Sequence, residues 1–468
     1  MLFNSEIYLF FLGLVVLLNW SLPTRRRVTF LVLASYVFYG YWSVPFLFLV
    51  IGMTAANFGF GLLQEGRRSR LLLAAIVVLN LGVLGLFKYL GFLESSALRV
   101  AAVLGLQSSV ALVHLILPLG LSFFAFEFLH YQIDLYRGGQ PVRDPLHFAL
   151  FPAFFPTQIA GPIKRYQDFE AQVGAQPRWD PGLFLEGIEL IALGLFKKVV
   201  LADSLLPIAD SVFSHTSTVT ALEGWTGLLA FSFQIYLDFS GYTDVARGSA
   251  QLLGYRVPNN FHAPYLATSI RDFWHRWHMS LSSWLRDYLY IPLGGSQKGR
   301  RRTFVNLLLT MALGGLWHGA AWHFVAWGTG HGAALAAHRA YSDRARTSPS
   351  AVWTRAVGGW ALTQAVVLGL WTLFRAPGLA AAAQLWRGLI AGGVSHPLLT
   401  WATILQVLGT CLLVLATEFI AVRVDVYGWL RTRNVGVVLR PAIVFSLAAA
   451  STFVAAIQVT HRFIYFQF

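Results

Sequence analysis

Apolar blocks of about 20 residues, the length of helix that crosses a bilayer, recur along the whole chain. Of the 468 residues, 56% are hydrophobic and 12% are charged, whereas soluble proteins carry about 25% charged residues. These features predict an all-α polytopic membrane protein of roughly ten to twelve spans, folded as one membrane-embedded domain over residues 1–468. The candidate spans are 5–22, 28–42, 44–63, 71–93, 111–135, 182–203, 224–252, 303–317, 320–338, 356–374, 400–422 and 437–459.

The net charge of +14 gathers in short loops between the apolar blocks, and no basic module of a nucleic-acid-binding type is visible. Basic residues cluster at 25–27, 67–70 and 298–302. Short basic loops between spans usually face the cytoplasm, so the pattern places the N-terminus outside, in the periplasm of a Gram-negative cell. We therefore expect membrane lipids with anionic headgroups, and no nucleic acid, as partners of these loops.

Three stretches are unlike simple spans. Residues 147–163 are apolar but broken by three prolines, residues 255–296 are aromatic and charged, and residues 314–332 are glycine-rich and hold three histidines. Irregular backbone at membrane depth is tolerated where protein or a water-filled cavity satisfies its polar groups. We therefore expect the three stretches to converge on a cavity. The most polar connection, expected to be flexible, is 341–350.

The segment that begins at residue 271 is rich in histidine and tryptophan. Treated as a helix, it puts Asp272, His275 and His278 three residues apart on one face. Its tryptophans, at positions 274, 277 and 284, suit a membrane interface. One interpretation is an interfacial anchor whose histidines only form hydrogen bonds. The other is a metal site of Asp272, His275 and His278, although no second carboxylate ligand is evident.

His318 lies in the apolar, glycine-rich run 313–323. Ionisable groups are costly to bury in a membrane, so each is a functional candidate. Flanking glycines let a ligand or another backbone approach closely, and a neutral imidazole is the usual group for moving a proton near neutral pH. His318 is either such a proton-transfer group or a histidine that bridges two helices. For His323 and His331 we favour a structural role.

Two carboxylates, Asp238 and Asp244, fall within an apolar span and must pair with something. Arg247 is three residues past Asp244, and Arg271 is a possible partner in space. A structural salt bridge is the favoured interpretation, and acid–base chemistry is the alternative. No nucleophile elbow, phosphate-binding loop or dinucleotide fingerprint is present in the sequence.

Together, these stretches resemble the membrane-bound O-acyltransferase family, in particular its bacterial branch of alginate O-acetyltransferases. The similarity extends along the chain and is densest in the core 150–332. The resemblance implies a ring of about 11–12 transmembrane helices, with re-entrant or interfacial helices, around a central funnel. The matching pieces are FFPTQIAGPI at 154–163, YLDFSGYTDVARGSAQLLGY at 236–255, PNNFHAPYLATSIRDFWHRWHMSLSSWLRDYLYIPLGG at 258–295, TMALGGLWHGAAWHFVAWGTGHG at 310–332 and FIYFQF at 463–468.

The resemblance also implies roles for individual residues. His318 matches the essential histidine of the family, and His278 matches the second motif position. Family members typically have arginine where this chain has His275, which argues against a catalytic His275 and against the metal site, so we expect no metal. The candidates for the substrate channel are Trp317, Trp274, Trp277, Ser280, Asp238, Asp244, Arg271 and Asp272.

The reaction implied by the resemblance is acyl transfer across the bacterial inner membrane. A cytoplasmic thioester, most simply acetyl-CoA, would supply an acetyl group for O-acetylation of an extracytoplasmic polysaccharide such as alginate. No tightly bound cofactor is needed. A periplasmic acetyltransferase of the SGNH-hydrolase type is the expected partner. Peptidoglycan O-acetylation and D-alanyl transfer to teichoic acid are alternatives within the family, and a transporter or channel is the alternative outside it.

Overall fold

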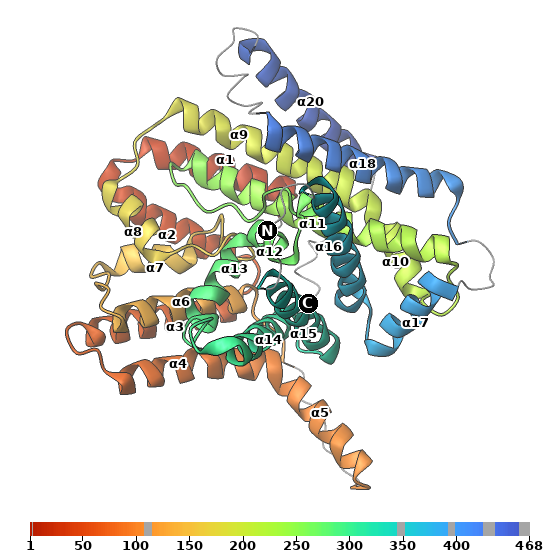
Figure 1. Ribbon diagram of the computed structural model, residues 1–468. Helices are drawn as coiled ribbons and strands as arrows, with labels where there is room; N and C mark the ends of the chain where they lie inside the picture. Colours follow the sequence, from red (N-terminus) through yellow and green to blue (C-terminus); the bar gives the residue numbers. More distant parts are fainter. Residues whose placement is uncertain (2, 107–114, 344–351, 392–397, 425–435, 458–468) are drawn as a thin grey trace. The chain divides into compact units, whose positions relative to one another are not determined.

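The structure, a computed structural model, describes residues 1, 3–106, 115–343, 352–391, 398–424 and 436–457. Within these ranges the regular structure is helical, and no β-strand occurs. The chain forms two compact units, one of residues 1–188 with 246–258 and the other of residues 189–245 with 259–468 (Figure 1). The FIYFQF motif at 463–468 and most of the polar connection 341–350 lie outside the described residues.

Three helices of the first unit, α1, α4 and α7, begin at a side chain that caps them. Ser5 accepts a hydrogen bond from the Tyr8 N–H at the start of α1, and Asp144 accepts from the N–H groups of Leu146 and His147 at the start of α7. Figure 1 shows α3 and α4 side by side. The helices are α1 (Glu6–Ser21), α2 (Thr24–Gly40), α3 (Val44–Gln64), α4 (Arg70–Leu84), η1 (Gly85–Tyr89), α5 (Leu90–Val103), α6 (Leu121–Tyr136), α7 (Pro145–Ala153), α8 (Tyr166–Ala175) and the start of α9 (Pro181–Leu195).

Three buried amides, which we call the amide cluster, connect α3, α4 and α6. Asn57 and Asn80 donate to each other's side-chain oxygens, with both N–O distances 3.0 Å. The Gln132 amide donates to the Asn57 carbonyl at 2.7 Å. All three residues are fully buried. Amide pairs of this kind hold helices together where the surrounding lipid provides no hydrophobic driving force.

The stretch 147–163 contains the predicted irregular backbone. α7 ends at Ala153, and a series of turns follows before α8 begins at Tyr166. A Cβ atom on Gly161 would lie 2.4 Å from the Thr157 Cα, so this turn has room only for glycine. Lys164 is buried beside it and binds the Glu127 carboxylate and the Thr157 hydroxyl, each at 2.8 Å. Irregular backbone here is therefore packed inside protein, as expected at membrane depth.

The second unit holds the motif-rich helices. α11 is a long helix whose last residues, from Ala246, belong to the first unit. Figure 1 shows α14 and α15 packed against one another. The further helices are η2 (Phe196–Ala202), α10 (Asp203–Ser214), α11 (Ala221–Leu252), η3 (Pro264–Leu266), α12 (Ile270–Arg276), α13 (Met279–Leu285), η4 (Arg286–Tyr290), α14 (Gly299–His318), α15 (Trp322–Ser342), α16 (Val352–Arg375), α17 (Leu379–Ala391), α18 (Trp401–Arg423) and α20 (Gly436–Ile457).

Apolar helices of membrane-spanning length occur in both units. By length and composition, five segments of the described chain could cross a membrane, and α1 is a shorter apolar helix. The protein is therefore an all-α, multi-pass membrane protein, as predicted. The total of roughly ten to twelve spans stays a prediction. The five segments are Val44–Gln64, Arg70–Val103, Ala356–Arg375, Trp401–Arg423 and Leu439–Ile457.

Candidate active site

The two carboxylates of α11 are paired with lysines. The Lys197 ammonium lies 2.7 Å from an Asp244 oxygen, and the Lys198 ammonium lies 2.6 Å from an Asp238 oxygen. Lys198 also binds Asp203 at 2.7 Å. These ion pairs, in which lysines are the cations, agree with the favoured salt-bridge interpretation.

Helix geometry explains how the two lysines reach the carboxylates of α11. A Cβ atom on Gly241 of α11 would lie 2.7 Å from the Gly194 carbonyl of α9, so the two backbones nearly touch. The lysines follow at once in η2, a π-helical segment that turns successive side chains by a smaller angle than an α-helix does. Adjacent lysines 197 and 198 therefore both reach α11. The presence of two lysines inside an apolar block of the sequence could have identified them as partners of the buried carboxylates.

The expectation that Asp272, His275 and His278 share one helix face is wrong. α12 ends at Arg276, and His278 adopts a left-handed backbone conformation with φ 42° and ψ 54°. His275 stays exposed on α12, where its Nδ1 lies 2.6 Å from the Arg271 carbonyl oxygen. The Asp272 carboxylate pairs with Arg276 at 2.8 Å. The break between the helices directs the two histidines into different surroundings.

His278 is completely buried. The edge of its ring meets the Phe239 ring at a centroid distance of 4.7 Å, and the Trp317 ring lies 6.4 Å away. Neither ring nitrogen has a hydrogen-bond partner among the described residues. Buried polar atoms are nearly always paired in folded proteins, so an imidazole of this kind is a candidate to bind substrate.

His318 is the last residue of α14, and the crossing of α14 and α15 determines its place. A Cβ atom on Gly315 would lie 2.2 Å from the Phe324 carbonyl oxygen, and one on Gly328 would lie 2.1 Å from the Met311 carbonyl oxygen. Only glycine at both positions allows the backbones to approach so closely. The glycines that mark this run in the sequence thus serve helix packing, which brings His318 against α15.

Aromatic rings surround the buried His318 on three sides. Trp317, Trp327 and Phe374 contact its ring at centroid distances of 4.9, 5.1 and 5.4 Å, each close to edge-on. Trp317 is also the neighbour of His278, so one indole adjoins both histidines. The rings shield the imidazole from water, and this shielding strengthens any hydrogen bond that the imidazole makes.

The third buried histidine, His331, lies on α15 and accepts a hydrogen bond at Nδ1 from the Trp274 indole N–H at 3.3 Å. Its ring is 4.9 Å from Trp327, which in turn contacts His318. We call His278, His318 and His331 the histidine cluster. His323 differs, because its Nδ1 is 2.9 Å from the Leu373 carbonyl oxygen and it is half-buried. A structural role for His323 agrees with this contact.

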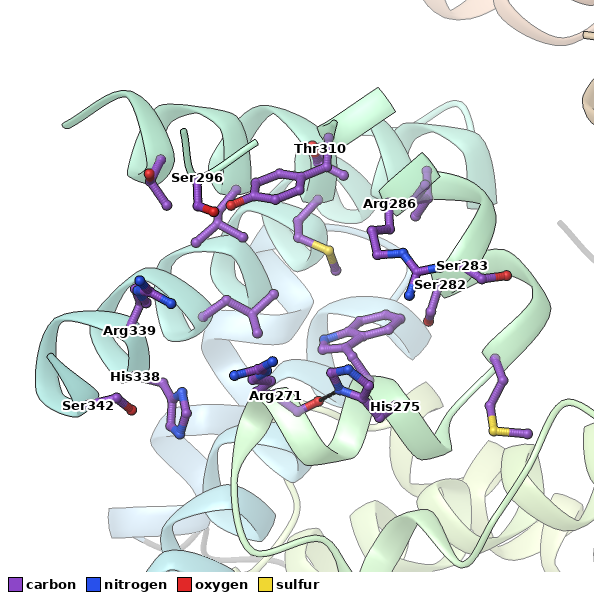
Figure 2. Close-up of a pocket in the computed structure, with 18 residues that line it drawn as sticks. Arg271, His275, Ser282, Ser283, Arg286, Ser296, Thr310, His338, Arg339 and Ser342 are labelled. Atoms are coloured by element: carbon purple, nitrogen blue, oxygen red, sulfur yellow. Dashed lines mark hydrogen bonds between the residues drawn. The ribbon is translucent and has the colours of Figure 1, made fainter. Parts of the chain in front are cut away.

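A pocket of about 510 Å³ (Figure 2) is lined in part by Trp274, the residue whose indole donates to His331 of the histidine cluster. His278, His318 and His331 themselves are not among its lining residues. In Figure 2, Arg271 and His275 extend from α12, His338 and Arg339 from α15, and Arg286 from the opposite wall. The interior is mostly apolar. The lining residues are Arg271, Trp274, His275, Met279, Ser282, Ser283, Leu285, Arg286, Tyr290, Ser296, Thr303, Leu307, Thr310, Met311, Leu335, His338, Arg339 and Ser342.

Two of the predicted channel residues, Arg271 and Trp274, line this pocket. Arg271 is exposed and has no ion pair in the described part of the chain, whereas Arg286 and Arg339 bind Asp287 and Asp343. The other predicted channel residues do not line it, and their roles stay predictions. These are Trp277, Trp317, Ser280, Asp238, Asp244 and Asp272. Of the three stretches expected to converge on a cavity, 255–296 contributes lining residues, whereas 147–163 and 314–332 contribute none, so their convergence stays a prediction.

No group of three or more His, Cys, Asp or Glu side chains is arranged to hold a metal ion within the described ranges. The separation of His278 from the exposed side chains of α12 accounts for this at the suggested Asp272–His275–His278 position.

Known proteins resemble this chain over most of its length. The model of the membrane-bound O-acyltransferase family matches residues 141–376. The probable alginate O-acetylase AlgI of Azotobacter vinelandii is 41% identical over 401 residues, which cover 84% of this chain and 79% of the relative. The peptidoglycan O-acetyltransferase of Helicobacter pylori is 34% identical, with 84% and 81% covered. The teichoic acid D-alanyltransferase of Streptococcus thermophilus is 29% identical, with 51% and 64% covered.

Proposed function

Because the chain belongs to the membrane-bound O-acyltransferase family and is an O-acyltransferase, we propose that it moves an acetyl group from a cytoplasmic thioester, acetyl-CoA, across the bacterial inner membrane. The acetyl group is destined for hydroxyls of an extracytoplasmic polysaccharide of the alginate type. This choice of polymer rests on the name of the Azotobacter vinelandii relative.

The observation that carries the proposal is a pocket lined by arginines and by apolar side chains and linked to the histidine cluster through Trp274. Its volume of about 510 Å³ suits a small-molecule group. Guanidinium groups bind phosphate through paired N–H donors, and Arg271 has its charge uncommitted in the described part of the chain. A donor of the acetyl-CoA type would place its phosphates against the arginines of the pocket and its pantetheine arm against the apolar side chains.

The position of the pocket along the chain favours donor entry from the cytoplasm. Its lining residues Ser296 and Thr303 flank the basic segment 298–302, which forms the start of α14 rather than a loop and which the distribution of charge predicts to be cytoplasmic. Trp274 at the inner wall contacts Trp327 at 5.9 Å, and Trp327 contacts His318. The thioester would thus enter near the basic segment 298–302 and present its acyl carbon toward His318.

In the proposed reaction His318 acts as a general base. Its imidazole takes the proton of the acceptor hydroxyl as the hydroxyl oxygen attacks the thioester carbonyl carbon. The carbon–sulfur bond then breaks, the acetyl group stays on the acceptor oxygen, and the imidazolium returns its proton to the thiolate. His278, on the other side of Trp317, would bind the acceptor or the carbonyl oxygen.

Because the histidines are buried, we propose that the immediate acceptor is a small hydroxyl compound or side chain, which then passes the acetyl group on to the polymer. A polymer needs an extended polar groove, and the described connections between helices are short. We therefore propose that a periplasmic acetyltransferase of the SGNH-hydrolase type receives the acetyl group and completes polymer modification. Peptidoglycan, on which the Helicobacter pylori relative acts by name, is the second candidate polymer.

Reconstitution in sealed vesicles tests the proposal. The full chain is inserted into vesicles with radiolabelled acetyl-CoA on the side of the 298–302 segment and alginate on the other side. We expect labelled alginate only when a periplasmic SGNH-type partner is added. Efficient labelling without the partner would show that it is dispensable, and labelling of peptidoglycan or no dependence on acetyl-CoA would contradict the assigned polymer or donor.

Orientation is tested separately by cysteine labelling after Cys411→Ser. A cysteine at position 68 or 300 is expected to react with a membrane-impermeant maleimide only after the cells are opened. Labelling of intact spheroplasts at either position would reverse the proposed direction of transfer.

A further inference from the structure

The backbone at His278 adopts a conformation that favours glycine, although the residue is a histidine. A φ of 42° lies in the left-handed region, which a residue with a β-carbon rarely adopts unless its surroundings enforce it. Catalytic histidines are commonly oriented by a hydrogen bond to one ring nitrogen. His278 has no such bond among the described residues, so some other group must fix its ring.

Asn260 lies beside this strained residue, although it is 18 positions earlier in the chain. Its carbonyl oxygen accepts from the Met279 N–H at 3.0 Å. Its side-chain oxygen accepts from both the N–H and the hydroxyl of Ser280, at 3.2 and 2.6 Å. Asn260 is completely buried, so these bonds are shielded from competing water.

A second backbone bond lies on the other side of His278. The His262 N–H donates to the Arg276 carbonyl oxygen at 3.0 Å, so segments 260–262 and 276–280 run antiparallel and are bonded before and after the histidine. The peptide that carries His278 is therefore held at both ends. The Phe239 ring contacts the imidazole from α11 and limits its rotation.

We infer that Asn260 is a positioning residue for His278, and this inference rests on the proposed role of His278 in acetyl transfer. Asn260 holds the left-handed turn that presents the imidazole with both ring nitrogens available. This arrangement differs from a histidine oriented through its own nitrogen, since one nitrogen can accept the acceptor hydroxyl while the other donates to a second oxygen. Aspartate at position 260 would keep a side-chain acceptor for Ser280, whereas alanine would remove that acceptor and retain only the backbone carbonyl that binds the Met279 N–H.

A double-mutant cycle separates positioning from general support of the fold. Asn260→Ala is expected to lower kcat for acetyl transfer about 10- to 100-fold, because a displacement of about 1 Å is costly, while the KM for acetyl-CoA stays within about twofold. In the His278→Gln background the same change should cost almost nothing further, since Asn260 acts through the missing imidazole. Asn260→Asp should recover most of the lost kcat.

Asn306→Ala is the matched control. Asn306 is equally buried, and its amide donates to the Gly295 carbonyl oxygen at 2.9 Å rather than to the flank of His278. Any loss that it causes should multiply with the loss from His278→Gln. If Asn260→Ala behaves in the same multiplicative way, or retains the wild-type kcat while His278→Gln does not, the inference is wrong.

Two further outcomes keep this test separate from the proposed function. Wild-type kcat in His278→Gln would refute the role of His278, and with it the premise of the inference. If Asn260→Ala fails to yield folded protein, Ser280→Ala takes its place in the cycle. It removes the 2.6 Å hydroxyl bond to Asn260 and should lower kcat about 3- to 10-fold, again without further effect in His278→Gln.

Discussion

The amide cluster of the first unit and the histidine cluster of the second are both polar groups buried among apolar helices, but they use their hydrogen bonds differently. Asn57 and Asn80 satisfy each other in both directions, and the Gln132 side-chain oxygen is the one atom of the amide cluster without a partner among the described residues. His278 keeps two ring nitrogens without a partner in the described structure, and His331 keeps one. A satisfied pair holds helices together, whereas unused donors and acceptors in a dry site are held ready for something that binds.

The difference also appears in the local backbone. The amides occupy regular helix positions in α3, α4 and α6. Two of the three histidines lie where a helix ends or breaks, His318 at the end of α14 and His278 in a left-handed turn, whereas His331 lies inside α15. Functional groups gather at such interruptions because strain there is compensated by the surrounding structure. Predictions that follow from the comparison concern catalysis for the histidines and stability for the amides.

The largest expected effect is that of His318→Ala. Removal of the general base should lower the rate of acetyl transfer about a thousandfold or more, while membrane insertion and thermal stability change little. Transfer from radiolabelled acetyl-CoA in vesicles measures it, beside His215→Ala, which removes an exposed histidine of the second unit. Wild-type transfer by well-folded His318→Ala protein would end the assignment.

A smaller effect separates the neighbouring histidines. His278→Ala should lower kcat about 100-fold, because the buried ring faces the site, and His275→Ala should lower it less than about threefold. His275 is exposed at the rim of the pocket and contacts a carbonyl of its own helix. Equal losses in the two variants would restore a joint role for the pair, and metal analysis of the purified protein would then decide between paired catalysis and metal binding.

Arg271→Gln tests the role of the pocket in donor binding, and its expected effect is smaller than that of His278→Ala. Loss of one uncommitted guanidinium at the rim should raise the KM for acetyl-CoA about tenfold and leave kcat nearly unchanged. Arg301→Gln, exposed in the first turn of α14 and outside the pocket lining, is the matched control and should leave KM unchanged. A fall in kcat without a change in KM would place Arg271 with the reacting groups rather than with the donor phosphates.

Helices and their apolar character could be predicted from the sequence because both depend on local pattern. Each predicted span overlaps a helix among the described residues, and the proline-broken stretch after α7 is irregular as expected. His318 could be singled out because an ionisable side chain in an apolar run is conspicuous. These signals lie within a few residues of the positions that they describe.

The remaining features depend on contacts between distant segments. The helix expected through His278 breaks because Asn260 competes for the backbone of residues 279 and 280, and no local periodicity reports that. The partners of Asp238 and Asp244 are lysines that only the close glycine contact of α9 and α11 brings within reach. The rings around His318 come from three helices and resemble ordinary core residues in the sequence.

The smallest expected effect belongs to the amide cluster, and it completes the comparison. Asn80→Leu leaves the Asn57 side chain without its reciprocal partner, and an interhelical hydrogen bond in a membrane protein is worth about 0.6 kcal/mol, with a maximum of about 1.7 kcal/mol. We expect a small fall in the denaturation midpoint in detergent and unchanged kcat. The double change Asn57→Leu with Asn80→Leu should cost less than the sum of the single changes, because neither side chain is then left buried and unpaired. If Asn80→Leu instead lowered kcat tenfold while the midpoint stayed constant, the amide cluster would have a functional role, and satisfaction of hydrogen bonds would no longer distinguish the two clusters.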